Sequence, residues 1–256
     1  MDHFGPTRLT PPDEMEIGPH PHIGLHTVTW LTAGEMVHTD SLGSEQAIRP
    51  GQLNLMTAGR GVAHAEQSVT GYEGDLHGLQ LWVAQPEQTR HGTPAFEHHT
   101  QLPQVEIGAA VITVIVGELA GSRSPARADT PLLGAELSIR RGAAVLPLRP
   151  DFEYAVVVLE GGLNVGADVV RPGSLGYLGT GRDELKVVAG EATRALVIGG
   201  RPCGQQVLMW WNFVARTPAE ITAARADWQS GGGERFGRVR SPLDRIDAPP
   251  APWRAG

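Results

Sequence analysis

The chain has little cysteine and no long apolar run. Cys203 is its one cysteine, so no disulfide can form within the chain, which fits a reducing compartment. No segment approaches the ~20 apolar residues that a membrane-spanning helix needs. Residues 1–16 are polar and acidic and lack the charged and then apolar regions of a signal peptide. We therefore expect a cytoplasmic protein without a membrane segment.

An excess of positive charge is also missing. The 256 residues include 21 Lys and Arg against 28 Asp and Glu, which gives a net charge of −7. Direct nucleic-acid binding requires a basic surface, so this function class is not expected, whereas a protein partner stays possible. Gly59 and Gly61 are not followed by the Lys-Ser/Thr of a phosphate loop, and no Gly-x-Ser-x-Gly sequence indicates a serine hydrolase.

Glycine (33) and proline (20) are abundant and punctuate short runs rich in β-formers. The clearest runs are 27–31, 52–56, 77–83, 109–117, 155–159 and 194–198. This pattern predicts an all-β fold of many short strands.

The runs form two β-rich blocks and a different C-terminal segment. We expect one barrel over 1–105, a second over 106–202, and a segment over 203–256. In that segment, Thr217 and Glu220 form a capping box with Pro218 at the first helical position, which predicts a helix over 218–229 followed by a tail. Residues 1–19 and 86–104 are expected to be irregular.

The two blocks share an internal repeat. Arg49-Pro50-Gly51-Gln52-Leu53 returns as Arg171-Pro172-Gly173-Ser174-Leu175, and Gly59-Arg60 returns at the same offset as Gly181-Arg182. Short matches in the same order and register indicate a duplicated barrel.

All ten histidines lie at or before position 99, and four potential metal donors stand out among the residues there. His20 and His22, like His64 and Glu66, are two residues apart, so each pair faces one side of a strand. Three imidazoles and a carboxylate suit Fe, Mn, Ni, Cu or Zn better than Ca or Mg. On the repeat, His64 and Glu66 fall on Lys186 and Val188, and His20 and His22 on Leu148 and Pro150. The second copy has therefore lost all four donors together.

Several motifs carry a resemblance to a known family. His20-Pro21-His22-Ile23-Gly24, the stretch 51–66, His77-Gly78-Leu79-Gln80-Leu81-Trp82-Val83 and Met209-Trp210-Trp211-Asn212-Phe213 resemble the pirin family over most of the chain. The resemblance implies a bicupin, two double-stranded β-helix (jelly-roll) barrels, with one divalent metal, iron first, held by His20, His22, His64 and Glu66. The second barrel would be free of metal.

The chain departs from the family pattern at three places. Ile23 stands where a basic residue is usual, and His26 where many members have Glu. Both positions are expected to lie beside the site and to affect substrate preference. Pirins normally have one or more strands before the segment that starts at Asp2, so we expect either a mis-assigned start or a form with an exposed sheet edge.

The resemblance implies a quercetin 2,3-dioxygenase type of activity on flavonol-like phenols with O₂. Glu66 would take the proton of the 3-hydroxyl as general base, and the ring would open with loss of carbon monoxide. The alternative is a non-enzymatic, redox-responsive or metal-responsive regulator that binds a transcription factor or metabolic enzyme. A metal-free structural cupin is a third interpretation, which the four donors disfavour.

The other histidines have no comparable pattern. His26, His38 and His77 are candidates for contact with the metal ligands from behind, although a buried structural role is favoured for His26 and His38. His91, His98 and His99 are expected to be exposed in the polar stretch 86–104.

Overall fold

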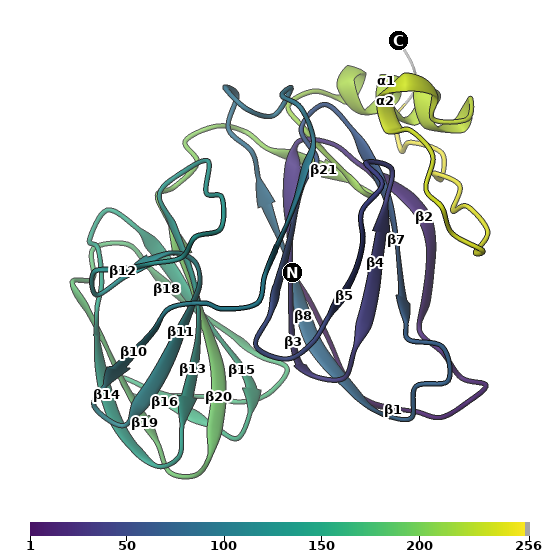
Figure 1. The fold of residues 1–256 in the computed structure, drawn as a ribbon. Helices are drawn as coiled ribbons and strands as arrows, with labels where there is room; N and C mark the ends of the chain where they lie inside the picture. The colour runs from purple at the N-terminus through teal and green to yellow at the C-terminus, as the bar shows by residue number, and fades with distance from the viewer. Residues whose placement is uncertain (254–256) are drawn as a thin grey trace. The chain divides into compact units, whose positions relative to one another are not determined.

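The computed structural model describes residues 1–253 and consists mostly of β-strands (Figure 1). The chain divides into two compact units, one formed by Met1–Thr100 together with the segment from Gln205 onward, the other by Gln101–Gly204. The C-terminal segment therefore belongs to the first unit rather than standing alone. None of the helices in the described part of the chain is long and apolar enough to span a membrane.

The first unit contains a barrel of two antiparallel sheets. One sheet has the strand order β1-β8-β3-β6-β9 and the other β2-β7-β4-β5, which is the alternation of a jelly roll. The strands are β1 (Asp2–Leu9), β2 (Glu16–His22), β3 (Leu25–Ala33), β4 (Met36–Asp40), β5 (Glu45–Ile48), β6 (Leu53–Thr57), β7 (Val62–Ser68), β8 (Gly74–Ala84) and β9 (Ala95–His99).

Two stretches predicted to be irregular contain strands. Asp2–Leu9 forms β1, which pairs with β8, and Ala95–His99 forms β9, which pairs with β6. Both are edge strands of the same sheet, so only one side of each is paired within it, and their mixed polar sequences lack the apolar run of a central strand. The prediction that 1–19 and 86–104 are irregular is therefore wrong for these residues.

The C-terminal segment adds a hairpin and two helices to the first unit. The elements are β21 (Leu208–Trp210), β22 (Phe213–Ala215), α1 (Pro218–Gln229) and α2 (Gly233–Phe236). Helix α1 covers the range that its capping box predicts, and the Thr217 side chain accepts the backbone N–H of Glu220. The short helix α2 was not foreseen. The last three residues of the predicted tail lie outside the described residues.

The second unit is a barrel with an aliphatic core. Its strands are β10 (Gln104–Ile107), β11 (Ala110–Leu119), β12 (Ser122–Arg123), β13 (Leu132–Ile139), β14 (Gly142–Pro147), β15 (Glu153–Glu160), β16 (Leu163–Val165), β17 (Asp168–Val170), β18 (Leu175–Gly179), β19 (Glu184–Ala189) and β20 (Thr193–Gly200). Leucine, isoleucine, valine and alanine dominate the interior, where the first barrel has polar side chains.

The predicted duplication is present in the sheet topology. The order β13-β20-β15-β18 repeats β1-β8-β3-β6, and β14-β19-β16-β17 repeats β2-β7-β4-β5. The two Arg-Pro-Gly turns are alike, since Gln52 N–H donates to Arg49 O and Ser174 N–H to Arg171 O, both at 3.0 Å. Each turn leads into the equivalent strand, β6 or β18.

The repeat aligns poorly in β19. Lys186 and Val188, the sequence counterparts of His64 and Glu66, are exposed, whereas Leu185 and Val187 are buried. Because side chains alternate along a strand, a slip of one residue exchanges the two faces. The inward positions of β19 in the second barrel are thus aliphatic, and the donors are absent there. The inward residues are not the ones that the sequence repeat aligned with His64 and Glu66.

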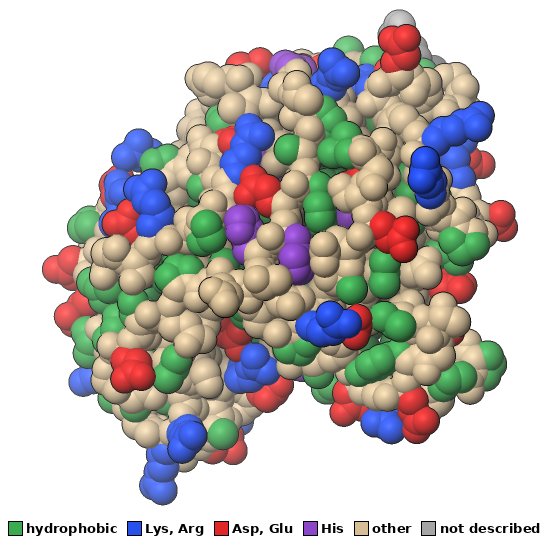
Figure 2. Space-filling view, viewed as in Figure 1, with side chains coloured by type: hydrophobic (Ala, Val, Ile, Leu, Met, Phe, Trp, Pro, Cys, Tyr) green, Lys and Arg blue, Asp and Glu red, His purple; other side chains and the backbone are tan. Residues whose placement is uncertain are grey.

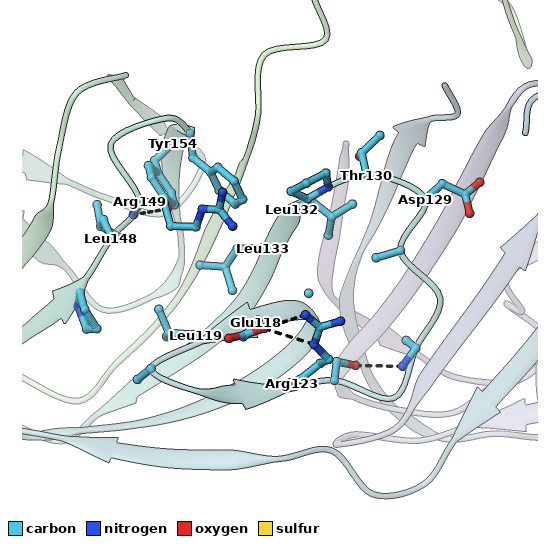
Figure 3. A pocket seen from close by; sticks show the side chains of 18 residues that line it. Glu118, Leu119, Arg123, Asp129, Thr130, Leu132, Leu133, Leu148, Arg149 and Tyr154 are labelled. Atoms are coloured by element: carbon cyan, nitrogen blue, oxygen red, sulfur yellow. Dashed lines mark hydrogen bonds and ion pairs between the residues drawn. The ribbon is translucent and has the colours of Figure 1, made fainter. Parts of the chain in front are cut away.

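The second unit has a cavity of about 520 Å³. Figure 3 shows that its lining combines leucines with charged side chains, of which Arg123 and Glu118 form an ion pair at 2.9 Å. The Arg149 guanidinium lies 4.4 Å from the centre of the Phe152 ring. The lining of the cavity is therefore mixed, with leucines beside polar and charged side chains.

Charge of both signs is mixed on the face of the molecule drawn in Figure 2, where Lys and Arg side chains lie among Asp and Glu. This face has no continuous basic surface of the kind that binds a nucleic-acid backbone, in line with the net charge of −7.

Candidate metal centre

The four predicted donors come from two neighbouring strands of the first barrel. β2 pairs with β7 so that His20 lies directly opposite His64, and β2 carries a register shift between Ile17 and His20. His22 and His64 are fully buried, and His20 and Glu66 are 6% and 5% exposed. The i, i+2 spacing thus directs all four side chains to the barrel interior.

The three imidazoles surround one point. The ring centre of His20 is 5.1 Å from that of His22 and 4.3 Å from that of His64, and the rings of His22 and His64 are 4.9 Å apart. One nitrogen from each ring lies within 4.8 Å of the others. The Nε2 atoms of His22 and His64 are only 3.0 Å apart.

Backbone carbonyls hold two of these rings from behind. His20 Nδ1 lies 2.9 Å from Gly18 O, and His22 Nδ1 lies 3.0 Å from Asn212 O. A carbonyl oxygen only accepts hydrogen bonds, so each Nδ1 carries the proton and each Nε2 of the neutral ring carries a lone pair. Such contacts fix the ring orientation of metal-binding histidines.

The site disfavours protonated histidine. Burial lowers the pKa of His20 to about 4, and burial followed by the neighbouring rings lowers the pKa values of His22 and His64 well below the ordinary value of 6.5. Neutral imidazoles are the form that binds metals. Three convergent, neutral rings direct three nitrogen lone pairs at one point, which fits a divalent cation. A single proton could bridge only two of the three nitrogens.

Glu66 faces the same interior from the next inward position on β7. Its Oε1 accepts a hydrogen bond of 2.8 Å from Gln80 Nε2, and Gln80 Oε1 in turn accepts from Trp82 Nε1 at 3.1 Å. Burial raises the Glu66 pKa, although His38 and Gln80 counteract the rise. Glu66 lies within 4.8 Å of His64 and His38, so His64 belongs to both donor groups in residues 1–253.

The C-terminal hairpin supports this centre. Val214 N–H donates to Ile23 O at 3.1 Å, directly after the ligand strand, and the hairpin brings Asn212 O to His22. Gly24 has a φ of +67°, and a Cβ on it would lie 2.2 Å from Val214 O. The Ile23-Gly24 sequence therefore permits the close approach of backbone that holds His22.

His26 and His77 lie on the opposite face of their sheet. Gln80 and Trp82, which contact Glu66 and His22, point inward from β8, and His77 alternates with them. His26 pairs in register with Val83 rather than Trp82, and its Nδ1 lies 2.9 Å from Thr57 Oγ1. His77 Nε2 lies 2.8 Å from His3 Nε2. The proposed site does not include either histidine.

The three histidines of the polar stretch 86–104 differ in their exposure. His91 is exposed, as expected. His98 and His99 are half-buried on β9, and His98 Nδ1 lies 2.7 Å from Asn54 Oδ1, so the expectation that they are exposed is wrong. The reason is the edge strand β9, which their polar surroundings concealed.

Sequence reasoning passed over three groups around the donors, namely Gln80 at Glu66, the Asn212 carbonyl at His22, and Asp40 behind His38. It allowed His38 a place behind the ligands but favoured a structural role, and the structure places the His38 ring beside His64. Gln80 and Asn212 do lie in motifs quoted above, and His38 and Asp40 repeat the i, i+2 spacing of the ligands. No spacing rule in the sequence connects them to particular partners.

Comparison with known proteins identifies the family of the chain. The chain matches the Pirin family over residues 1–83 and the Pirin C-terminal cupin domain over 135–237. It is 46% identical to a Pseudomonas aeruginosa protein named "Putative quercetin 2,3-dioxygenase PA1205", over 99% of this chain and 81% of that one. The chain belongs to the pirin family.

Further relatives support the fold of this pirin. A pirin-like protein of Caulobacter vibrioides is 34% identical over 90% of this chain and 82% of its own. The crystal structure of a quercetin 2,3-dioxygenase from Acinetobacter baumannii has a TM-score of 0.94 and 40% identity, covering 99% of this chain and 85% of that one. The predicted all-β bicupin with a short C-terminal helix is thus confirmed.

The two departures from the pirin pattern beside the ligands do not point at the donors. Ile23 packs into an apolar cluster with Phe213 and Trp228, where a basic side chain would be costly. His26 faces away, as described above. The expectation that these positions lie at the site is therefore wrong, because Ile23 follows the last residue of β2 and points into the apolar cluster, and His26 takes the outward face of β3.

Gln80→Leu is expected to weaken metal binding about 10-fold, because Glu66 loses the amide that orients it and stays buried. Isothermal titration with Mn²⁺ measures the change. Gln104→Leu, on an exposed strand of the second unit, is the matched control and should bind as the wild type does. Equal affinities in all three proteins would show that Gln80 does not orient Glu66.

Proposed function

We propose that this pirin is a metal-dependent dioxygenase of the quercetin 2,3-dioxygenase type, acting on flavonol-like phenols. The observation that carries the proposal is the convergence of three neutral imidazoles, with His22 Nε2 and His64 Nε2 3.0 Å apart, next to a buried carboxylate. The relatives named for quercetin 2,3-dioxygenase activity, at 46% and 40% identity, support the reaction class.

His20, His22, His64 and Glu66 would hold the metal through three nitrogens and one carboxylate oxygen. This donor set suits iron, the ion we favour, and also Mn, Ni, Cu or Zn. When bound, the metal supplies a Lewis acid for the phenolic oxygens and an open position for O₂. The chain's part is to keep the three rings neutral and oriented, which the Gly18 and Asn212 carbonyls do for His20 and His22.

Glu66 is the proposed general base. Gln80 binds its Oε1, which leaves Oε2 to face the reacting group. Burial raises the Glu66 pKa, and a carboxylate with a raised pKa accepts a proton from a phenol more readily at neutral pH. Glu66 would thus remove the proton of the 3-hydroxyl and prepare the flavonol for attack by O₂.

Aromatic side chains flank the donors and favour a flat substrate. The Trp82 ring packs edge-on against His22, with ring centres 5.1 Å apart, and the Phe96 ring stacks on His38 at 4.5 Å. Both Trp82 and Phe96 are half-buried, so part of each ring stays accessible. Apolar surface around a few polar groups is typical of a site for phenols.

Glu66→Gln is expected to slow quercetin turnover about 10²–10⁴-fold, because the amide cannot take the 3-hydroxyl proton. The assay follows flavonol absorbance and carbon monoxide release in air, with the metal content measured for each protein. Glu106→Gln, on exposed β10, is the control and should keep full activity. A metal-loaded wild type that is inert on a panel of flavonols would contradict the dioxygenase proposal and favour the regulatory alternative, testable by partner pull-down.

A further inference from the structure

Two buried polar residues beside the metal centre are not among its four donors. His38 and Asp40 lie on β4 and are 5% and 1% exposed. β4 pairs with β7 so that His38 is opposite Glu66 and Asp40 is opposite His64. Directly opposed residues share a face of the sheet, so both side chains point into the interior that holds the donors.

The two residues form a chain of contacts that ends on His64. His38 Nδ1 lies 3.3 Å from His64 Nδ1, and His38 Nε2 lies 3.2 Å from Asp40 Oδ2. Asp40 is itself held, because its Oδ1 accepts the backbone N–H groups of Leu42 and Ser44, each at 2.9 Å. The His38 ring stacks on Phe96 with an interplanar angle of 10°. Each member of the chain is therefore fixed in place.

These contacts between Asp40, His38 and His64 determine which ring nitrogens carry protons. The Asp40 carboxylate accepts, so His38 carries its proton on Nε2 and offers a lone pair at Nδ1. His64 Nδ1–H then donates to His38, and the lone pair of His64 lies on Nε2, the atom that faces His22. His64 thereby reaches the same tautomer that carbonyl oxygens impose on His20 and His22.

We propose that Asp40 and His38 are positioning residues that orient His64 and strengthen it as a metal donor. The inference rests on the proposed metal site. His20 and His22 are backed by neutral carbonyls, whereas His64 is backed by a chain that ends in a carboxylate, which makes a ligand more basic. His64 is thus the strongest of the three nitrogen donors.

A role of His38 as a ligand is the competing interpretation, since His38, His64 and Glu66 also lie within 4.8 Å of one another. His64 Nδ1 faces His38 and His64 Nε2 faces His22. His38 could coordinate only an ion on the Nδ1 side of His64, either as a second ion or in place of one among the three imidazoles. The two interpretations therefore differ in whether His38→Phe removes a ligand and, if both positions fill, in the number of ions bound.

Titration with Co²⁺ tests the proposal, using the visible spectrum for coordination and competition with a chelator for affinity. Asp40→Asn keeps the shape and the Oδ1 acceptor but removes the charge. His38→Phe keeps a ring stacked on Phe96 but cannot accept the His64 proton. We expect each variant to bind one Co²⁺ about 10–100-fold more weakly, with the spectral band positions of the wild type. Asp168→Asn, exposed on β17, is the control and should bind as the wild type does.

The double variant that combines Asp40→Asn with His38→Phe distinguishes an effect of Asp40 through His38 from two independent effects. If Asp40 acts through His38, Asp40→Asn should add little to the loss already seen in His38→Phe. Unchanged affinity in both single variants, two ions per wild-type chain, or a spectrum that indicates a lost ligand in His38→Phe would each overturn the proposal. A wild type that binds no Co²⁺ would instead refute the metal site itself, so the two failures are distinguishable.

Discussion

His64→Ala is expected to weaken divalent metal binding roughly 10²–10³-fold and to abolish the proposed dioxygenase activity. A structural metal site contributes about 10–16 kcal/mol, so one ligand of four accounts for about 2.5–4 kcal/mol. His64 joins the two donor groups of this centre, because it meets His22 through Nε2 and His38 through Nδ1. Its loss should disconnect the two donor groups.

Elemental analysis after dialysis and a chelator-competition titration measure this effect. His91→Ala makes the same substitution at a side chain that is 59% exposed, and it should retain one ion per chain. Circular dichroism checks that both variants are folded. If His64→Ala retains a full complement of metal at wild-type affinity, the centre does not use His64 and the site is wrong.

Acidification is expected to destabilise the metal-free first unit between about pH 6.5 and pH 4. Burial, as the main cause, lowers the pKa of His20 to about 4 and lowers the pKa values of His22 and His64 well below 6.5. The unfolded chain binds protons near pH 6.5 that the folded site rejects, so stability is complete above that pH and is lost as the pH falls. His20 alone contributes about 3 kcal/mol over this range.

Glu66 acts in the opposite direction. Because burial raises its pKa, the folded state gains relative stability as the pH falls toward the ordinary value of 4.5. One carboxyl opposes three histidines, so a net loss is expected.

The tryptophans make this loss measurable in the first unit alone. All six lie outside residues 101–204, at positions 30, 82, 210, 211, 228 and 253. Urea unfolding followed by tryptophan fluorescence at pH 7.5, 6.5, 5.5 and 5.0 should give midpoints that fall with pH. Saturating metal should restore them at pH 5.5, since a ligand at 100 times its Kd adds about 3 kcal/mol. Midpoints that do not change between pH 7.5 and 5.0 would contradict the conclusion that the three histidine rings are buried and neutral in the folded state.

Much of the site could be predicted because strands have a period of two. His20 and His22, and His64 and Glu66, each share a face by spacing alone, and the structure directs both pairs inward. The same rule was insufficient in β19, where Lys186 and Val188 face outward, because a short repeat does not show a slip of one residue between turn and strand. Edge strands β1 and β9 were missed because polar edges lack the apolar signal of central strands.

The sequence by itself determined the fold class, the duplicated barrels, helix 218–229 and the concentration of donors in the first half, since these depend on local pattern and on motifs shared with the pirin family. Tertiary structure alone decided which groups hold the donors: Gln80 at Glu66, Asn212 at His22, and Asp40 through His38 at His64. Asn212 is 190 residues from His22 along the chain. Such contacts arise from sheet register and from a C-terminal hairpin that returns to the first barrel, and no local periodicity encodes either.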